Sequence, residues 1–444
     1  MTSDHRLLQA SIDDQVIGWL HEVNGLWSFQ YNTAWLSAPH AHPLSPHLPL
    51  QPDLLMDGAT QRPVQWYFDN LLPEEGQREL LARDARVDRA DAFGLLTAYG
   101  AETAGSLTLL PPGATAAAAG LRPLPDGALS ARIAQMPRLP LAHGAVKRMS
   151  LAGAQHKLAV TVGANDLLFE PEGSRASTHI LKPDPPDTDY PHSVANEWFT
   201  MRLAARLSLD VPTVARRYVP EPVYLIQRFD RQANADGCKR LHAIDACQVL
   251  GLDRAYKYRE GSIARLAELA IACRSPAVAR TRLYAWLLFN VLIGNSDAHL
   301  KNLSFLVTHQ GLQLAPFYDL LSVACYDTTA YNKDRWPATT ELAWPILGIS
   351  RFADINRDVL LAAGTALGLN LATTNRLLDR LCQRIRAEAD LLHAQLEAEN
   401  ADLARTTPAL WPTLAGEARC IRTLRHVVIE DMLGSSQKTE NKAR

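Results

Sequence analysis

The sequence predicts an α+β fold with two lobes, the first rich in strands and the second rich in helices. Residues 145–230 contain short runs in which apolar and polar side chains alternate, which is the pattern of strands. Residues 231–432 carry apolar side chains mainly at helical spacing, interrupted by one loop and one short hairpin. The chain has 444 residues, 47% of them hydrophobic, so it is long enough for a large core divided over two or three subdomains.

Residues 1–110 are expected to form an additional α+β subdomain before the first lobe. Its strand-like segments are residues 16–19, 26–31 and 107–110, and its helical segments are residues 65–70 and 77–85. The run Pro-Glu-Glu at 73–75 is a typical helix start. Residues 111–144 are expected to be a low-complexity linker with a short amphipathic helix at 129–136.

Both lobes show further periodic segments. In the first lobe we expect strands at residues 156–162, 167–170, 178–182, 212–219 and 223–229, and a helix at 194–207. In the second lobe an apolar helix at 277–293 ends at Gly294, a good C-terminal stop. A strand–turn–strand hairpin follows at residues 303–308, 309–311 and 312–315. The polar end, 433–444, is expected to be disordered.

The composition excludes several function classes. The formal net charge is −2, so the chain has no global basic field for nucleic acid or anionic membranes. Six scattered cysteines form no C-x-x-C pair, so neither a zinc site nor a disulfide framework is expected. The longest apolar stretch, residues 283–293, is too short to span a bilayer. The first residues lack the basic and apolar regions of a signal peptide, so we expect a cytoplasmic protein.

The segment between the helix and the hairpin carries the strongest chemical signal. Asp297 and Asn302 are five residues apart, which lets one tight loop point both side chains into one cavity, and Asp319 follows the hairpin. Phosphoryl transfer needs these parts: one Asp accepts the proton of an attacking hydroxyl, and an Asn and a second Asp hold Mg²⁺. The same spacing also occurs by chance in many loops, so the rest of the chain must decide.

Two charged residues of the first lobe fit this chemistry. Lys182 ends a strand and could neutralise phosphate charge in a cleft; the alternative is a surface lysine on an edge strand. Glu197, in the following helix, could pair with Lys182 as the helix-borne glutamate of kinases does. An exposed helical glutamate is the favoured alternative for Glu197.

Two further segments could contact a nucleotide. Residues 149–157 form a turn of small residues before a strand, and small side chains let backbone N–H groups approach phosphate oxygens. The P-loop pattern is absent, and a plain β-turn is the favoured alternative. The hinge candidates Gln227, Arg228 and Phe229 follow an apolar strand and join the lobes, where backbone groups could bind adenine; the alternative is an ordinary linker.

Taken together, these segments resemble the HipA family of serine/threonine-kinase toxins, over nearly the whole chain. The matching segments are YFDNLLP at 67–73, SLAGAQHK at 150–157, THILK at 178–182, NE at 196–197, RFDR at 228–231, GNSDAHLKN at 294–302 and PFYDLLS at 316–322. The order and spacing of so many segments are far more specific than any single motif. The resemblance implies a bilobal, protein-kinase-like fold.

The resemblance also implies a role at each matching position. Asp297 would accept the proton, Asn302 and Asp319 would hold Mg²⁺, and Lys182 would contact the phosphates of ATP. Ser150 would be the autophosphorylated serine whose modification pulls its loop out of the site. Other nucleotide-binding positions would be the covering loop of Ala152, Gly153, Ala154, Gln155, His156 and Lys157, the hinge of Gln227, Arg228 and Phe229, and His299, Leu300, Lys301 and Tyr318.

Family members phosphorylate essential proteins, an aminoacyl-tRNA synthetase in the best-known cases. The resemblance therefore implies a protein substrate and a small helix-turn-helix antitoxin, HipB, through which alone the protein would meet DNA. Two positions depart from the family pattern, because Gln227 and Ile244 replace the usual glutamates. Two alternatives stay open: a small-molecule kinase of the same fold, and a non-enzymatic partner of a transcriptional repressor.

Overall fold

The computed structural model describes residues 5–13, 15–114, 118–136, 138–145, 147, 149–234 and 237–438. The chain divides into two compact units. The first unit contains residues 1–186, 225–256 and 304–315, and the second contains residues 187–224, 257–303 and 316–444. The first unit is rich in strands and the second in helices, so the predicted α+β class is confirmed.

The N-terminal sheet of the first unit has the strand order β4-β3-β2-β1-β5. Its strands are β1 (His5–Ile12), β2 (Gln15–Val23), β3 (Leu26–Tyr31), β4 (Leu55–Met56) and β5 (Leu107–Leu110). In β3 every second side chain is buried, namely Trp27, Phe29 and Tyr31, so one face of the sheet forms a core. The helices of this region are α1 (Thr33–Leu36), α2 (Pro63–Asp69), α3 (Glu75–Ala85) and α4 (Ala92–Tyr99).

A second sheet of the first unit carries the segments around Ser150 and Lys182. Its strands that lie wholly in this unit follow the order β9-β7-β8-β6: β6 (Gly120–Pro123), β7 (Leu158–Val162), β8 (Leu168–Glu172) and β9 (His179–Pro183). β7 pairs antiparallel with both β8 and β9, and Leu158 faces Leu181 in the register. Helix α5 (Asp126–Ile133) follows β6.

The remaining strands of the first unit are short hairpins. β12 (Arg231–Asn234) pairs with β13 (Gly237–Arg240), and a three-stranded sheet has the order β14-β15-β16. Its members are β14 (Ala243–Asp245), β15 (Ser304–Thr308) and β16 (Gly311–Leu314), and α7 (Ala246–Leu250) follows β14. β11 (Pro222–Gln227) passes from the second unit into the first.

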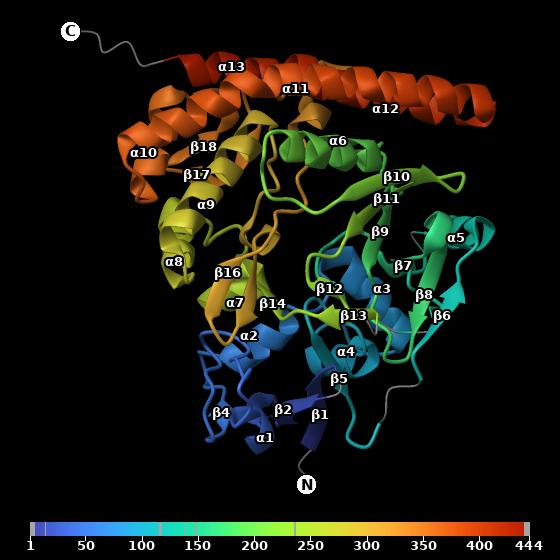
Figure 1. The fold of residues 1–444 in the computed structure, drawn as a ribbon, viewed down its shortest axis with the longest axis vertical. Helices are drawn as coiled ribbons and strands as arrows, with labels where there is room; N and C mark the ends of the chain where they lie inside the picture. Colours follow the sequence, from blue (N-terminus) through green and yellow to red (C-terminus); the bar gives the residue numbers. More distant parts are fainter. Residues whose placement is uncertain are drawn as a thin grey trace. The chain divides into compact units, whose positions relative to one another are not determined.

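The second unit is built around a long helix. α11 (Leu371–Thr406) packs against α12 (Trp411–Thr423) and α13 (Ile429–Gln437), which Figure 1 shows in orange and red. It buries apolar side chains at a spacing of three or four residues, which is typical of an amphipathic helix: Leu378, Leu381, Ile385, Ala389, Leu392 and Leu396. The other elements are α6 (Ser193–Arg206), β10 (Val214–Tyr218), α8 (Ile263–Ala272), α9 (Pro276–Leu292), β17 (Glu341–Ile346), β18 (Ile349–Arg351) and α10 (Arg357–Ala366).

Some expectations need correction. The segment 111–144, expected to be a linker with a short helix, also contains a strand, because β6 pairs with β8. The tail expected from 433 is helical through Gln437, and 439–444 lie outside the described residues. The expected border near 230 also differs, because the hairpin β15–β16 belongs to the first unit. Within the described ranges, no helix has an apolar run long enough to cross a membrane.

Candidate active site

The expected site residues are divided between the two compact units. The second unit carries Asp297, Asn302 and Asp319 with their neighbours. The first unit carries Ser150, Lys182 and the segment 227–229. The loop of residues 294–302 contributes most of the chemistry in the second unit.

The 294–302 loop begins at a turn that requires glycine. Helix α9 ends at Leu292, and Gly294 has a φ of +64°. A Cβ atom at Gly294 would lie 2.6 Å from the Cβ of Ala324 and 2.7 Å from Cγ1 of Val428. Any larger residue at this position would clash with Ala324 and Val428 and would push the loop away from them.

Asn295 fixes the backbone around the two carboxylates. Its Nδ2 donates a hydrogen bond to Oδ1 of Asn290 at 2.7 Å, and its Oδ1 accepts the backbone N–H of Asp297 at 3.0 Å. The same Nδ2 donates to the backbone carbonyl of Asp319 at 3.4 Å. Asn295 is only 3% exposed, so water competes little for these bonds. One side chain thus links the segments that carry Asp297 and Asp319.

Asp297 and Asn302 are brought together within the loop. The backbone carbonyl of Asp297 accepts hydrogen bonds from Nδ2 of Asn302 and from the N–H of His299, both at 2.8 Å. A single 3₁₀ turn, Leu300–Asn302, brings the chain back so that the side chain of Asn302 reaches the carbonyl of Asp297. The half-buried carboxylate of Asp297 accepts a hydrogen bond from the hydroxyl of Tyr258. The five-residue spacing therefore closes one tight loop, as the sequence predicts.

Asp319 lies on an uncommon backbone conformation. Its φ is +52°, in the left-handed region that non-glycine residues rarely adopt. The preceding residues are anchored: the N–H of Phe317 donates to the carbonyl of Asp210 at 2.8 Å, and the hydroxyl of Tyr318 donates to the carbonyl of Lys301 at 2.8 Å. Strain of this kind persists only where the surroundings hold it, and it is concentrated at functional sites.

Glu197 and Asp319 both lie near the hydroxyl of Tyr224. Burial raises the pKa of Tyr224 well above its usual value, and the negative charges of Glu197 and Asp319 raise it further. Glu197 is 4% exposed, so the alternative of an exposed helical glutamate is wrong. Its pairing with Lys182, which belongs to the other unit, stays a prediction.

The donor set of this unit suits Mg²⁺. In the described part of the chain, no group of three or more His, Cys, Asp or Glu side chains could hold a metal ion. Mg²⁺ is usually bound through one or two carboxylates, with waters and substrate phosphates completing its shell. Asp319 offers a carboxylate, and Asn302 offers an amide oxygen while its Nδ2 is bonded to the carbonyl of Asp297. These oxygen donors fit Mg²⁺ better than the softer metals that prefer sulfur or imidazole.

The other expected residues of the loop are buried. His299 is 8% exposed, Leu300 is 1% exposed and Lys301 is 6% exposed. The His299 ring meets the Tyr258 ring edge-on, with 4.9 Å between centroids. The backbone N–H of Leu300 donates to the carbonyl of Lys257 at 3.1 Å. These contacts hold the loop to the segment that contains Tyr258.

In the first unit, Ser150 is fully buried. Its Oγ donates a hydrogen bond to the carbonyl of Leu71 at 2.5 Å, and its N–H donates to the carbonyl of Glu102 at 2.7 Å. Its exposed fraction is 0%. In this arrangement there is no room for a phosphate group on the hydroxyl, so the modified serine would have to leave its position.

The loop after Ser150 is tied to the start of α3. Pro73 pairs with Gly153 in a parallel bridge, and the N–H of Glu74 donates to the carbonyl of Gly153 at 3.4 Å. Gly153 has a φ of +106°, and a Cβ atom there would lie 2.6 Å from Nζ of Lys157. That Nζ donates to the carbonyl of Ala152 at 2.5 Å. The turn therefore needs glycine for its backbone angle, whereas the flexible Lys157 side chain could move aside.

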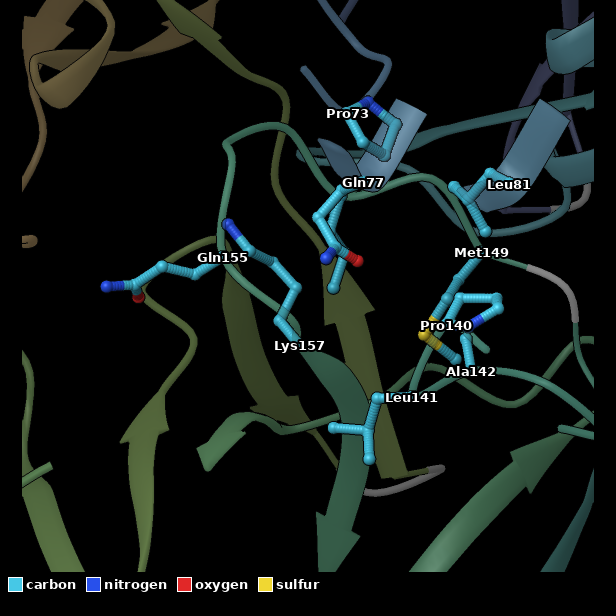
Figure 2. A pocket seen from close by; sticks show the side chains of 10 residues that line it. Pro73, Gln77, Leu81, Pro140, Leu141, Ala142, Met149, Gln155 and Lys157 are labelled. Carbon is cyan, nitrogen blue, oxygen red and sulfur yellow. The ribbon is translucent and has the colours of Figure 1, made fainter. Parts of the chain in front are cut away.

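A small cleft lies beside this loop (Figure 2). It is lined by Gln77 and Leu81 of α3, by residues 140–142 and by Met149, Gln155 and Lys157 among others. The cleft encloses about 20 Å³, enough for one water molecule. Figure 2 shows the Gln155 side chain pointing away from the other lining side chains. The cleft is too small for a nucleotide.

His156 does not bring positive charge to the loop. Burial lowers the pKa of His156 to about 4, so the ring is neutral near pH 7. Its Nδ1 has no hydrogen-bond partner among the described residues. Any contact of His156 with a phosphate would therefore be that of a neutral ring.

Lys182 and the hinge candidates differ in exposure. Lys182 is 7% exposed on β9, so the alternative of a surface lysine is wrong. Gln227 is exposed at the end of β11. The N–H of Arg228 donates to the carbonyl of Thr178 at 2.9 Å. This amide is therefore already bonded within the first unit, and the hinge role of residues 227–229 stays a prediction.

The side chain of Arg228 belongs to a buried ion network. Arg228 bonds Asp230 at 2.7 Å and Glu102 at 3.3 Å. Burial alone would raise the pKa of Glu102, but surrounding cations hold it well below its usual range: Arg231, Lys147, Arg228 and Arg240. Because the carbonyl of Glu102 also accepts the N–H of Ser150, this network supports the base of the Ser150 loop.

The sequence reasoning missed two residues, Asn295 and Tyr258. Asn295 lies inside the recognised motif, but an amide that bonds the backbone cannot be told from sequence. Tyr258 lies 39 residues before Asp297, so no local spacing connects them. The run Lys-Tyr at 257–258 carried no signal of its own.

Comparisons with known proteins identify the family of the chain. Residues 149–389 match the model of the HipA-like C-terminal domain, and residues 8–110 match that of the HipA N-terminal domain. The serine/threonine-protein kinase toxin HipA of Shewanella oneidensis is 34% identical over 342 residues, which cover 72% of this chain and 76% of that protein. Y4mE of Sinorhizobium fredii, a proposed kinase, is 36% identical over 337 residues, which cover 72% of this chain and 78% of that protein.

A solved structure is similar over nearly the whole chain. The complex of HipA, HipB and operator DNA from Shewanella oneidensis contains a chain with a TM-score of 0.73 and 27% sequence identity. The similarity covers 96% of this chain and 99% of that one. With one domain model matching more than half of its length and relatives above 30% identity, the chain belongs to the HipA family of kinases.

Proposed function

We propose that the protein is an ATP- and Mg²⁺-dependent protein serine/threonine kinase and the toxin of a toxin–antitoxin pair. One observation carries this proposal: the 294–302 loop holds Asp297 and Asn302 by hydrogen bonds and is linked to Asp319 through Asn295. These are the residue types that a kinase uses for proton acceptance and metal binding. Membership of a kinase family agrees with the same chemistry.

Each residue has a defined task in the proposed reaction. Asp297 orients the hydroxyl of a serine or threonine and accepts its proton. Asn302 and Asp319 hold the metal, and Lys182 contacts the phosphates. When bound, Mg²⁺ would offset the negative charge of the nucleotide phosphates. Positioning and charge stabilisation of this kind supply most of the catalysis in phosphoryl transfer.

The 150–157 loop would cover the phosphates and also switch the enzyme off. Its small residues, Ala152 to Ala154, allow backbone N–H groups to approach a phosphate. A phosphate on Ser150 would add roughly two negative charges at pH 7. The bond from Ser150 to Leu71 would be lost, and with it the support of the covering loop. Autophosphorylation at Ser150 would thus be self-inactivating.

The proposed partners follow from the similar complex. The related chain was solved with HipB and operator DNA. With a formal net charge of −2, this chain has no basic field of its own for DNA, so we propose that it meets DNA only through a HipB-like helix-turn-helix antitoxin. The substrate would be a cytoplasmic protein, and an aminoacyl-tRNA synthetase is the first candidate.

The experiment for this proposal is phosphoproteomics after induced expression of the wild type and of an Asp297→Ala variant. We expect new phosphoserine or phosphothreonine on a small set of proteins with the wild type alone. Growth arrest by the variant as strong as that by the wild type would contradict the kinase mechanism. Phosphate incorporation into small molecules without any protein acceptor would instead support a small-molecule kinase.

A further inference from the structure

Tyr258 lies directly against the proposed proton acceptor. Its hydroxyl donates a hydrogen bond to Oδ1 of Asp297. Its ring also meets the His299 ring edge-on, with an angle of 81° between the planes. Tyr258 and both partners belong to the second unit, which is compact in itself. The side chain thus contacts two neighbouring positions of the 294–302 loop.

The segment around Tyr258 is anchored to the loop at both ends. On one side, the carbonyl of Lys257 accepts the N–H of Leu300 at 3.1 Å, and Nζ of Lys257 lies 5.1 Å from the centre of the Tyr258 ring. Lys257 is only 7% exposed. A lysine over an aromatic face is attracted to it, so this contact also holds the ring in place.

On the other side, Gly261 packs against Trp344. The N–H of Gly261 donates to the carbonyl of Tyr258 at 3.0 Å, and a Cβ atom at Gly261 would lie 2.5 Å from the Trp344 ring. Nε1 of Trp344 in turn donates to the carbonyl of Ala298 at 3.0 Å. The Tyr258 segment is therefore fixed to the 294–302 loop on both sides of Tyr258.

We propose that Tyr258 is a positioning residue for Asp297, which extends the proposed kinase function and rests on it. The carboxylate of Asp297 can rotate about its terminal bond, and only some orientations present an oxygen to an incoming hydroxyl. The hydrogen bond from Tyr258 selects one orientation before the substrate arrives. Such preorganisation lowers the cost of reaching the reactive geometry. The contact needs no chemistry on Tyr258 itself.

The alternative to a positioning role for Tyr258 is that of a gate. A tyrosine hydroxyl on Asp297 could occupy the place of the substrate hydroxyl and would then have to leave. Although Tyr258 is 37% exposed, three contacts join its segment to the 294–302 loop: through the His299 ring, the Leu300 backbone and, by way of Trp344, the Ala298 carbonyl. A residue held in this way acts as a support. The two roles predict opposite effects of removing the hydroxyl.

The test compares Tyr258→Phe with the wild type in a steady-state assay of phosphate transfer to protein. We expect kcat to fall about 10- to 100-fold, the loss of one hydrogen bond to a charged group, while the KM for ATP and the thermal midpoint stay unchanged. Tyr218→Phe is the matched control, because Tyr218 donates to the carboxylate of Glu417 at 2.8 Å elsewhere in this unit. Its kcat should stay at the wild-type value.

A double-mutant comparison separates positioning from a merely structural role. If Tyr258 acts through Asp297, then Tyr258→Phe should cause no further loss in an Asp297→Asn background. The same fold-loss in both backgrounds, or wild-type or raised kcat in Tyr258→Phe, would overturn the proposal. Failure of the kinase assignment itself would look different, since the Asp297→Ala variant would then turn over normally.

Discussion

The side-chain oxygen of Asn295 accepts the backbone N–H of Asp297 at 3.0 Å, so the proposed proton acceptor is held by the residue two positions before it. The amide nitrogen of Asn295 binds Asn290 and reaches the carbonyl of Asp319. A single buried amide therefore connects α9 with both carboxylate-bearing segments.

Asn295→Ala should lower kcat for phosphate transfer by more than it weakens ATP binding. The buried N–H of Asp297 and the side chain of Asn290 would lose their partners, which costs about 1–3 kcal/mol per unsatisfied group. Kinetics and urea denaturation measure the two effects. Asn375→Ala is the control: its Nδ2 donates to the carbonyl of Leu371 and its Oδ1 accepts from Arg357, and neither partner has a proposed role in the reaction. Equal kcat values for Asn295→Ala and the wild type would remove Asn295 from the site.

Lys182→Ala should weaken ATP binding by a few kcal/mol at most, because one charge-assisted contact to phosphate is lost. Isothermal calorimetry with ATP and Mg²⁺ measures the change. Lys239→Ala changes an exposed lysine in the same unit and should leave the affinity as it is. Unchanged affinity and unchanged turnover in Lys182→Ala would mean that this buried lysine is structural.

Ser150 should become phosphorylated when the protein is incubated with ATP and Mg²⁺. Its modified form should be inactive, because the phosphate cannot occupy the buried position beside Leu71. Mass spectrometry should find phosphate on Ser150 in the wild type and none in the Asp297→Ala variant. The Ser150→Ala variant should keep its activity during a long incubation in which the wild type declines. Full activity and ATP affinity in the Ser150-phosphorylated protein would refute the switch.

The free energy of unfolding should decrease as the pH is lowered, because His242 is buried as a neutral ring. Burial, together with the nearby His42, lowers the pKa of His242 to about 3. The folded state keeps this ring neutral, whereas the unfolded chain takes up a proton near its ordinary pKa of 6.5. The stability that depends on the neutral His242 ring is thus fully present above pH 6.5 and is lost as the pH falls from 6.5 towards 3. The expected slope is about 1.4 kcal/mol per pH unit for one proton.

Urea denaturation at pH 7 and pH 5 tests this slope. His242→Gln should be less stable at pH 7 but should lose less stability between the two pH values. His309→Gln is the control, because His309 lies exposed in the turn between β15 and β16. A pH dependence of His242→Gln equal to that of the wild type would show that other groups are responsible.

The elements that the sequence predicted best are those with strong periodicity and clear ends. The strand pattern of 26–31 and the apolar helix before Gly294 both appear within a residue of the expected bounds. β1 and α4 were not expected. β6 was also missed, because an edge strand of four residues in a Gly-Ala-rich segment has almost no pattern of its own.

The site was predictable only where its residues share a loop. Asp297 and Asn302 lie close in sequence, so their spacing alone indicated that they meet. Tyr258 and Glu102 act through contacts that the tertiary fold creates, and a single sequence contains no sign of them. Asn295 lies inside the motif, but the sequence does not show which groups its amide bonds. The buried state of Lys182 and Glu197 was equally hidden, because a charged residue in sequence is more often exposed than buried.

The most direct test of the account is transfer of ³²P from labelled ATP to protein by the wild type, Asp297→Ala and Asp319→Ala. Each variant should unfold at the temperature of the wild type within a few degrees, and each should lose transfer entirely. Asp319→Ala should also lose the dependence of ATP binding on Mg²⁺, whereas Asp297→Ala should keep it. Transfer at the wild-type rate by either folded variant would contradict the assignment of this site.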